Sequence, residues 1–117
     1  MDPKIKRKWL AALRSGEYVQ GKGNLLSIEE SGEHSFCCLG VLCDLHSRET
    51  GQKWEVKKYD NVFSGLYNVS RYLENCNILP SAVEKWAGDN IPNWTLADMN
   101  DNGKSFKTIA NYIEKEI

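Results

Sequence analysis

One run of residues, 35–46, constrains the fold more than any other part of the chain. It reads Ser-Phe-Cys-Cys-Leu-Gly-Val-Leu-Cys-Asp-Leu-His and contains a single acidic residue, whereas 26% of the whole sequence is charged. Three of the four cysteines lie within it. Such an apolar run is buried in a folded protein, so we expect the core to form around it.

The run is long enough for a buried helix or a buried strand, and its periodicity alone does not separate the two. Its leucines recur every third residue, as on one side of a helix, and Gly51 provides a left-handed stop. Ser35 is the expected N-cap, because its hydroxyl can accept from the first free N–H groups. We therefore predict a mostly buried helix over residues 36–48. Gly40 costs about 1 kcal/mol relative to alanine there, which indicates that another element packs closely against it.

The other segments supply elements that can cover this helix. The 117 residues are 41% hydrophobic and include four tryptophans, which is sufficient for one folded domain spanning residues 1–117. Turn residues near position 31 predict a hairpin within residues 25–36, and alternating polarity predicts a strand over 53–59. Capping signals and apolar spacing predict helices over residues 3–14, 81–87, 95–100 and 106–117, with a further one considered over 69–75. We predict an α+β domain with about four or five helices around the buried central helix and a small antiparallel sheet.

Charge and composition restrict the compartment and the partners. The net charge is −1, which does not favour a general nucleic-acid binder. No apolar run approaches the roughly 18 residues that cross a bilayer, and the first residues lack the apolar segment of a signal peptide. We therefore expect a soluble, cytoplasmic protein with no membrane or nucleic-acid partner.

The cysteines raise three possibilities. Cys37 at a helix N-terminus could be a nucleophile with His34 as its base, and Cys43 with His46 could begin a zinc site. However, the paired C-x-x-C spacing of a zinc knuckle is absent. We expect buried, reduced thiols, no metal and no cofactor.

Four landmarks carry a resemblance to a known family: residues 8–18, 36–45, 79–88 and 96–110. Together they resemble a family of small proteins encoded by tailed bacteriophages and prophages, and the central run is the most specific of the four. The resemblance implies a phage or prophage origin and an accessory role in an infected bacterium. It assigns no catalytic or binding residue, and it does not extend over residues 60–76.

Aromatic side chains outside the regular helical patterns suggest a binding site. The middle of the chain contains large aromatics and cations without a clean period, so packing alone does not explain them. The predicted ligand-binding residues are Trp54, Lys57, Lys58, Tyr59, Tyr67, Arg71 and Tyr72. Trp94 is a further aromatic in a poorly patterned segment, and the basic face of the first helix, with Lys4, Arg7 and Lys8, is the next candidate.

These observations predict a non-catalytic binding module of the phage or prophage accessory type. Its expected target is a host or defence component, which is a protein partner or a small nucleotide signal. The alternative is a small thiol-dependent enzyme that uses Cys37 with His34.

Overall fold

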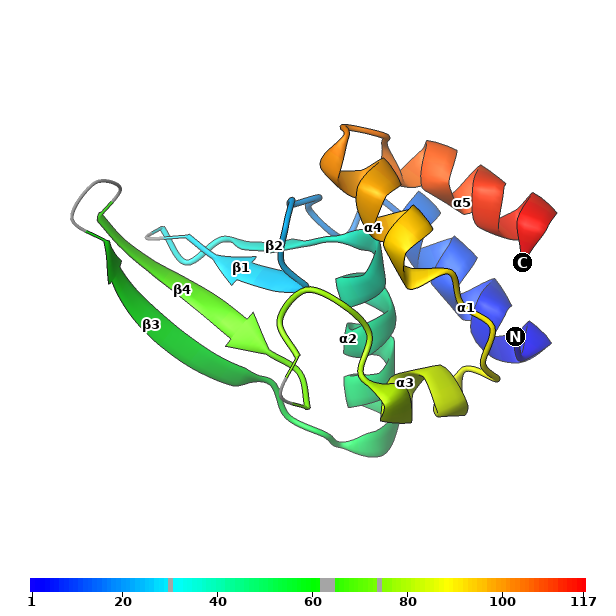
Figure 1. Ribbon diagram of the computed structural model, residues 1–117, viewed down its shortest axis with the longest axis horizontal. Coiled ribbons are helices and arrows are strands. Elements are labelled where there is room, and N and C mark those ends of the chain that lie inside the picture. Colours follow the sequence, from blue (N-terminus) through cyan, green and yellow to red (C-terminus); the bar gives the residue numbers. More distant parts are fainter. Residues whose placement is uncertain (30, 62–64, 74) are drawn as a thin grey trace.

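The computed structural model describes residues 1–29, 31–61, 65–73 and 75–117, and within residues 56–70 it describes only the backbone of two strands. The α+β prediction is confirmed. Figure 1 shows the helices gathered at one end of the molecule and the two longest strands reaching toward the other. The elements in the described residues are α1 (Pro3–Arg14), β1 (Leu26–Ile28), β2 (His34–Phe36), α2 (Cys38–Thr50), β3 (Glu55–Asn61), β4 (Gly65–Arg71), α3 (Ser81–Trp86), α4 (Asn93–Asp101) and α5 (Phe106–Glu116).

The sheet has four strands in the order β2-β1-β4-β3, and each neighbouring pair is antiparallel. Leu26 of β1 is paired with Phe36 on one side and with Ser70 on the other. The helix considered over residues 69–75 is wrong, because residues 69–71 belong to β4. A strand paired on both edges satisfies its backbone groups through partners distant in sequence, which local patterns do not reveal.

The central helix forms as predicted but begins later. Ser35 lies in β2, and the N-cap is Cys37, whose Sγ accepts from the Gly40 N–H at 3.4 Å. Ser35 as N-cap is therefore a wrong prediction, because pairing with β1 keeps residues 34–36 extended. Gly51 ends the helix with a φ of 80°, as expected for a left-handed stop.

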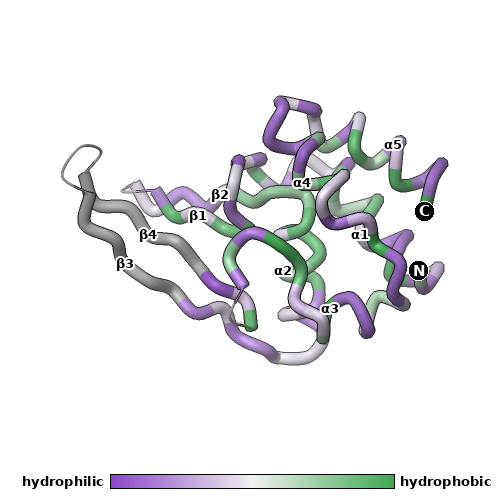
Figure 2. Tube along the Cα trace, in the orientation of Figure 1, coloured by the Kyte–Doolittle hydropathy of each residue, from purple (hydrophilic) through white to green (hydrophobic). Residues whose placement is uncertain are grey.

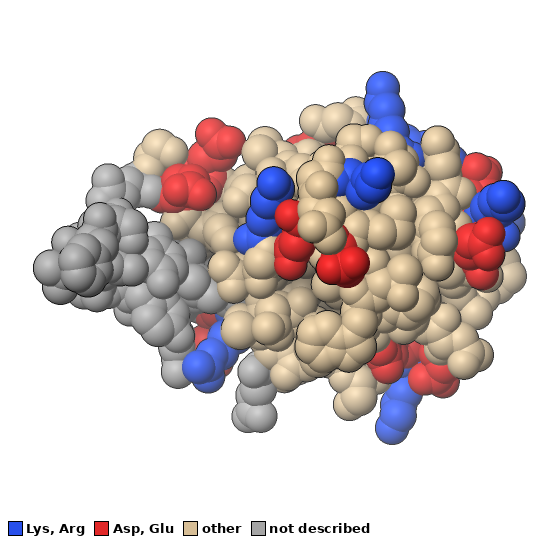
Figure 3. Space-filling view, turned by 45° about the horizontal axis from the view of Figure 1, so that its top comes forward, with Lys and Arg blue, Asp and Glu red and all other residues tan. Residues whose placement is uncertain are grey.

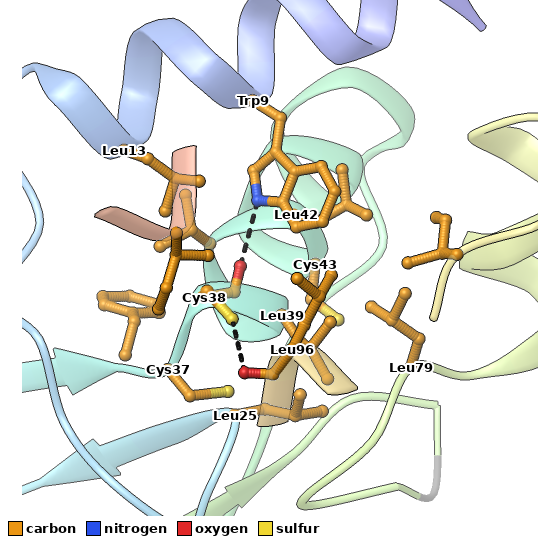
Figure 4. Close-up of a cluster of buried hydrophobic side chains, with 14 of the residues drawn as sticks. Trp9, Leu13, Leu25, Cys37, Cys38, Leu39, Leu42, Cys43, Leu79 and Leu96 are labelled. Atoms are coloured by element: carbon orange, nitrogen blue, oxygen red, sulfur yellow. Dashed lines mark hydrogen bonds between the residues drawn. The ribbon is translucent and has the colours of Figure 1, made fainter. Parts of the chain in front are cut away.

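The core surrounds α2, whose first half is buried on all sides. Figure 2 shows apolar stretches in α1, α2 and α5, and α1 packs against both of the other helices. Figure 4 shows two of the hydrogen bonds that link neighbouring helices to the first turn of α2: Trp9 Nε1 donates to the Cys38 carbonyl oxygen at 3.0 Å, and Cys38 Sγ lies 3.5 Å from the Leu96 carbonyl oxygen. These bonds hold α1 and α4 against α2.

The two terminal helices are capped as the sequence predicts. Asp2 Oδ1 accepts from the backbone N–H groups of Lys4 and Ile5, and Ser105 Oγ accepts from Thr108 N–H.

Among the described helices, none has the length and apolar character needed to cross a membrane.

A buried amide fixes the far end of α4. Asn100 is fully buried, and its Oδ1 accepts from Cys38 N–H at 3.2 Å and from Gln20 Nε2 at 3.0 Å. Its Nδ2 donates to the Gly21 carbonyl oxygen at 2.7 Å. Because buried amides are costly to leave unpaired, these bonds hold α4 in one position relative to α2 and to the segment after α1.

Candidate binding surface

Of the seven residues predicted to bind a ligand, the structure describes the side chains of three: Trp54, Arg71 and Tyr72. The side chains of Lys57, Lys58, Tyr59 and Tyr67 lie outside the described part of the chain, and only their backbone register is given. Tyr59 is paired with Tyr67 across β3 and β4. The assignment of these four residues to a ligand site therefore stays a prediction.

The prediction that Tyr72 binds a ligand is wrong, because its side chain is fully buried. Its hydroxyl lies 2.6 Å from His46 Nδ1, and its ring packs 4.7 Å from the Trp54 ring, measured between centroids. Burial raises the pKa of Tyr72 to about 12 and lowers the pKa of His46. The ring packs between the end of β4 and α2, which local sequence patterns could not show, and it is not available to a ligand.

Trp54 is half-buried and has a structural partner. Its Nε1 donates to Asp44 Oδ1 at 3.2 Å, and Asp44 Oδ2 accepts from Tyr18 Oη at 2.6 Å and from Arg48 Nε at 3.1 Å. The pKa of Tyr18 is raised by burial and by its bond to Asp44. These bonds join the segment after α1, helix α2 and the entry to β3. Of the predicted residues with described side chains, Arg71 is half-buried in β4 and remains a candidate.

Trp94 is the most exposed large hydrophobic side chain in the described residues. It is 72% exposed, whereas the only other such side chain in that part of the chain, Val19, is 47% exposed. Helix α4 begins at Asn93, two residues before the predicted start, so Trp94 lies in its first turn. The sequence places Trp94 in a poorly patterned segment, but it does not show whether another element covers the ring.

Two shallow grooves meet at Trp94 and Thr95, with volumes of about 520 and 560 Å³. The residues that line them define the Trp94 surface: Ile78, Leu79, Ser81, Glu84, Ile91, Pro92, Asn93, Trp94, Thr95, Ala97, Asp98 and Asp101. This surface combines a large aromatic with aliphatic side chains and carboxylates. It can therefore form the apolar centre and the polar rim of a contact.

The base of the Trp94 surface is held by hydrogen bonds. Asn93 Oδ1 accepts from Leu79 N–H at 2.9 Å, and Asn93 Nδ2 donates to the Ile91 carbonyl oxygen at 3.2 Å and to Glu84 Oε1. Leu96 beneath is fully buried. Trp94 therefore projects from a fixed support, which reduces the ordering cost of binding.

Comparison with known proteins places the chain in a family. Residues 1–117 match the family described as "Domain of unknown function (DUF8296)". The chain belongs to this family. No curated protein and no solved structure matches the chain.

The cysteines of this DUF8296 chain lack the environment of a nucleophile. Cys37 is 4% exposed, and burial raises the pKa of its thiol to about 11. His34 is exposed, and the hydrogen bonds among the described residues include none between it and Cys37. Cys38 and Cys43 are fully buried as predicted, and burial raises the pKa of each. In the described residues, no group of three or more His, Cys, Asp or Glu side chains is placed to hold a metal.

Thiol labelling checks this account of the cysteines. In native protein near neutral pH, we expect a disulfide reagent such as Ellman's reagent to modify Cys76 first, because it is half-buried whereas the other three thiols are buried. All four should react after unfolding. Cys76→Ser should remove the fast phase, and rapid labelling of Cys37 in that variant would contradict the structure.

The basic face of α1 is the next candidate in this DUF8296 chain, and one of its three cations has a partner. Lys8 lies beside a pocket of about 280 Å³ that Leu45, Arg48, Glu49 and Trp86 also line. Lys8 Nζ is 3.7 Å from Glu49 Oε1, and Arg48 is paired with Asp44. Of the three residues of this face, Lys8 therefore already faces a carboxylate, whereas Lys4 and Arg7 are exposed and stay a prediction. On the face shown in Figure 3, acidic and basic side chains are interspersed rather than gathered by sign.

Proposed function

We propose that this DUF8296 protein is a non-catalytic binding module that holds a protein partner on the Trp94 surface. The observation that carries the proposal is the 72% exposure of Trp94 where two grooves meet. Tryptophan is strongly enriched among the residues that dominate binding energies at protein interfaces. A large ring that is exposed on a fixed support can be buried by a partner with little loss of conformational entropy.

The proposed setting is the cytoplasm of an infected bacterium. There the protein would act as a phage or prophage accessory factor on a host or defence protein. The resemblance of residues 36–45 and the flanking landmarks to phage and prophage proteins supports this setting. A protein partner is favoured over a nucleotide signal, because carboxylates line the Trp94 surface and would repel phosphate groups.

The described surroundings of Cys37 favour binding over thiol catalysis. A cysteine nucleophile needs a thiolate, which requires a lowered pKa or an adjacent base. The burial of Cys37 acts in the opposite direction by raising its pKa to about 11. The described environment of Cys37 therefore gives no support to the pairing with His34.

Affinity capture with matched variants tests the proposed function. We expect the tagged full chain to recover a specific protein from phage-infected cells. Trp94→Ala should reduce that recovery by about ten-fold or more, because truncating a hot-spot residue costs about 2 kcal/mol or more.

Val19→Ala is the matched control for this capture experiment. It also removes an exposed hydrophobic side chain, but Val19 lies outside the linings of both grooves. Recovery with Val19→Ala should equal that of the wild type. Equal recovery of the same protein by Trp94→Ala would refute the use of this surface.

A further inference from the structure

We propose that the segment held on the Trp94 surface is cationic: a stretch of the partner protein that presents arginine or lysine side chains. This inference rests on the proposed function of that surface and specifies the chemistry of its occupant. It goes beyond the exposure of Trp94, because it rests on the charges around the ring.

The charge of the surface has one sign. Three carboxylates, from Glu84, Asp98 and Asp101, line the two grooves, and the described lining residues include no lysine or arginine. The whole chain is nearly balanced, with 15 basic and 16 acidic residues. Lys85 adjoins Glu84 in sequence and is exposed, but it lies outside both linings. The described lining of the Trp94 surface is therefore acidic, although the whole chain is nearly neutral.

Hydrogen bonds hold two of the three carboxylates in place on the groove walls. Asp101 Oδ1 accepts from Gly23 N–H at 2.9 Å, and Glu84 Oε1 accepts from Asn93 Nδ2. Asp98 is exposed, and the side-chain hydrogen bonds of the described residues do not engage its carboxylate. Each carboxylate keeps acceptor capacity, because an ionised carboxyl group has about four lone-pair sites.

Arginine best matches this combination of groups. Its planar guanidinium can stack on an aromatic face while its N–H groups donate to nearby carboxylates. Tryptophan is the strongest of the aromatic side chains in attracting a cation over its ring. Lysine satisfies the charge but lacks the planar stack, so we expect arginine to bind more tightly than lysine. Phosphate-bearing ligands, including nucleic acids, meet like charge on the same walls.

A peptide assay tests the inference without knowledge of the partner. The probes are fluorescein-labelled peptides of about nine residues that alternate glycine with arginine, lysine, glutamate or uncharged citrulline. We expect the full chain to bind the arginine peptide about ten-fold or more tightly than the glutamate and citrulline peptides by fluorescence anisotropy. Raising NaCl from about 0.05 to about 0.5 M should weaken this binding, because salt screens exposed charges.

Matched variants locate the binding in the same assay. Trp94→Ala and Asp98→Lys should each weaken binding of the arginine peptide by about ten-fold. The first removes the aromatic ring that stacks on the guanidinium, and the second replaces a carboxylate that pairs with it by a cation. Glu33→Lys makes the same change in net charge in the turn between β1 and β2, a hairpin that lies apart from α4 (Figure 1), and should weaken binding of this peptide by less than about two-fold. All three positions are exposed, so the melting temperatures should stay near that of the wild type.

The outcomes separate this inference from the proposed function. Equal weakening by Glu33→Lys and Asp98→Lys, or no preference for the arginine peptide, would overturn the inference by showing no local recognition of cations. In the capture experiment, a partner lost with Trp94→Ala but retained by Asp98→Lys would leave the proposed function standing and refute the cationic segment. A partner retained by Trp94→Ala would refute the proposed function itself.

Discussion

Gly40→Ala is expected to lower the free energy of unfolding by about 3 kcal/mol or more. A Cβ at this position would lie 1.7 Å from the Leu25 carbonyl oxygen and 2.6 Å from the carbonyl carbon. Both are backbone atoms, so no side-chain rotation relieves the contact. Leu25 is also tied through its N–H to the Cys76 carbonyl oxygen at 2.6 Å. The roughly 1 kcal/mol that alanine gains over glycine in a helix is too small to offset this clash.

Gly21→Ala is the matched control for Gly40→Ala. A Cβ there would meet Ser35 Oγ at 2.7 Å, which can turn away, and Ser35 Cβ at 3.0 Å, which a small shift relieves; the nearest backbone atom is at 3.4 Å. Chemical denaturation of the two variants should give a much smaller loss of stability for Gly21→Ala. A Gly40→Ala variant with wild-type stability would mean that α2 and Leu25 do not approach as described.

Trp9→Ala is expected to cost about 3–5 kcal/mol, which is the range for truncating a buried tryptophan. Trp9 is fully buried, and it joins α1 to α2 both by packing and by its hydrogen bond to the Cys38 carbonyl oxygen. A single domain has about 5–15 kcal/mol of stability in total. This variant should therefore be the least stable of the tryptophan variants, as measured by denaturant unfolding.

Two further variants separate the contributions at Trp9. Trp9→Phe keeps an aromatic ring but loses the indole donor, so it should cost less than Trp9→Ala. Trp94→Ala makes the same truncation at an exposed ring and should change stability by less than about 0.5 kcal/mol. Equal losses for Trp9→Ala and Trp94→Ala would contradict the difference in burial between the two rings.

The candidate site was only partly predictable from the sequence. An aromatic residue in a poorly patterned segment suggests a binding role, and Trp54, Tyr72 and Trp94 all lie in such segments. The environments of the three side chains differ: Tyr72 is fully buried, Trp54 is hydrogen-bonded to Asp44, and Trp94 is 72% exposed. The residue types are alike, so exposure depends on what packs over each ring. That is decided by contacts between segments distant in the sequence.

The sequence by itself determined the features that depend on neighbouring residues. Burial of the central run follows from its lack of charge, Gly51 ends α2 because it tolerates a positive φ, and Asp2 and Ser105 cap helices through their own side chains. Gly40 within the helix also predicted a close contact with another element, but the sequence did not identify Leu25 as the partner. Only the tertiary structure decided that residues 69–71 pair as a strand, that Cys37 rather than Ser35 caps α2, and which aromatic ring stays in water. The physical reason is that strand pairing and side-chain burial draw their free energy from non-local partners, whose positions are set only when the whole chain has folded.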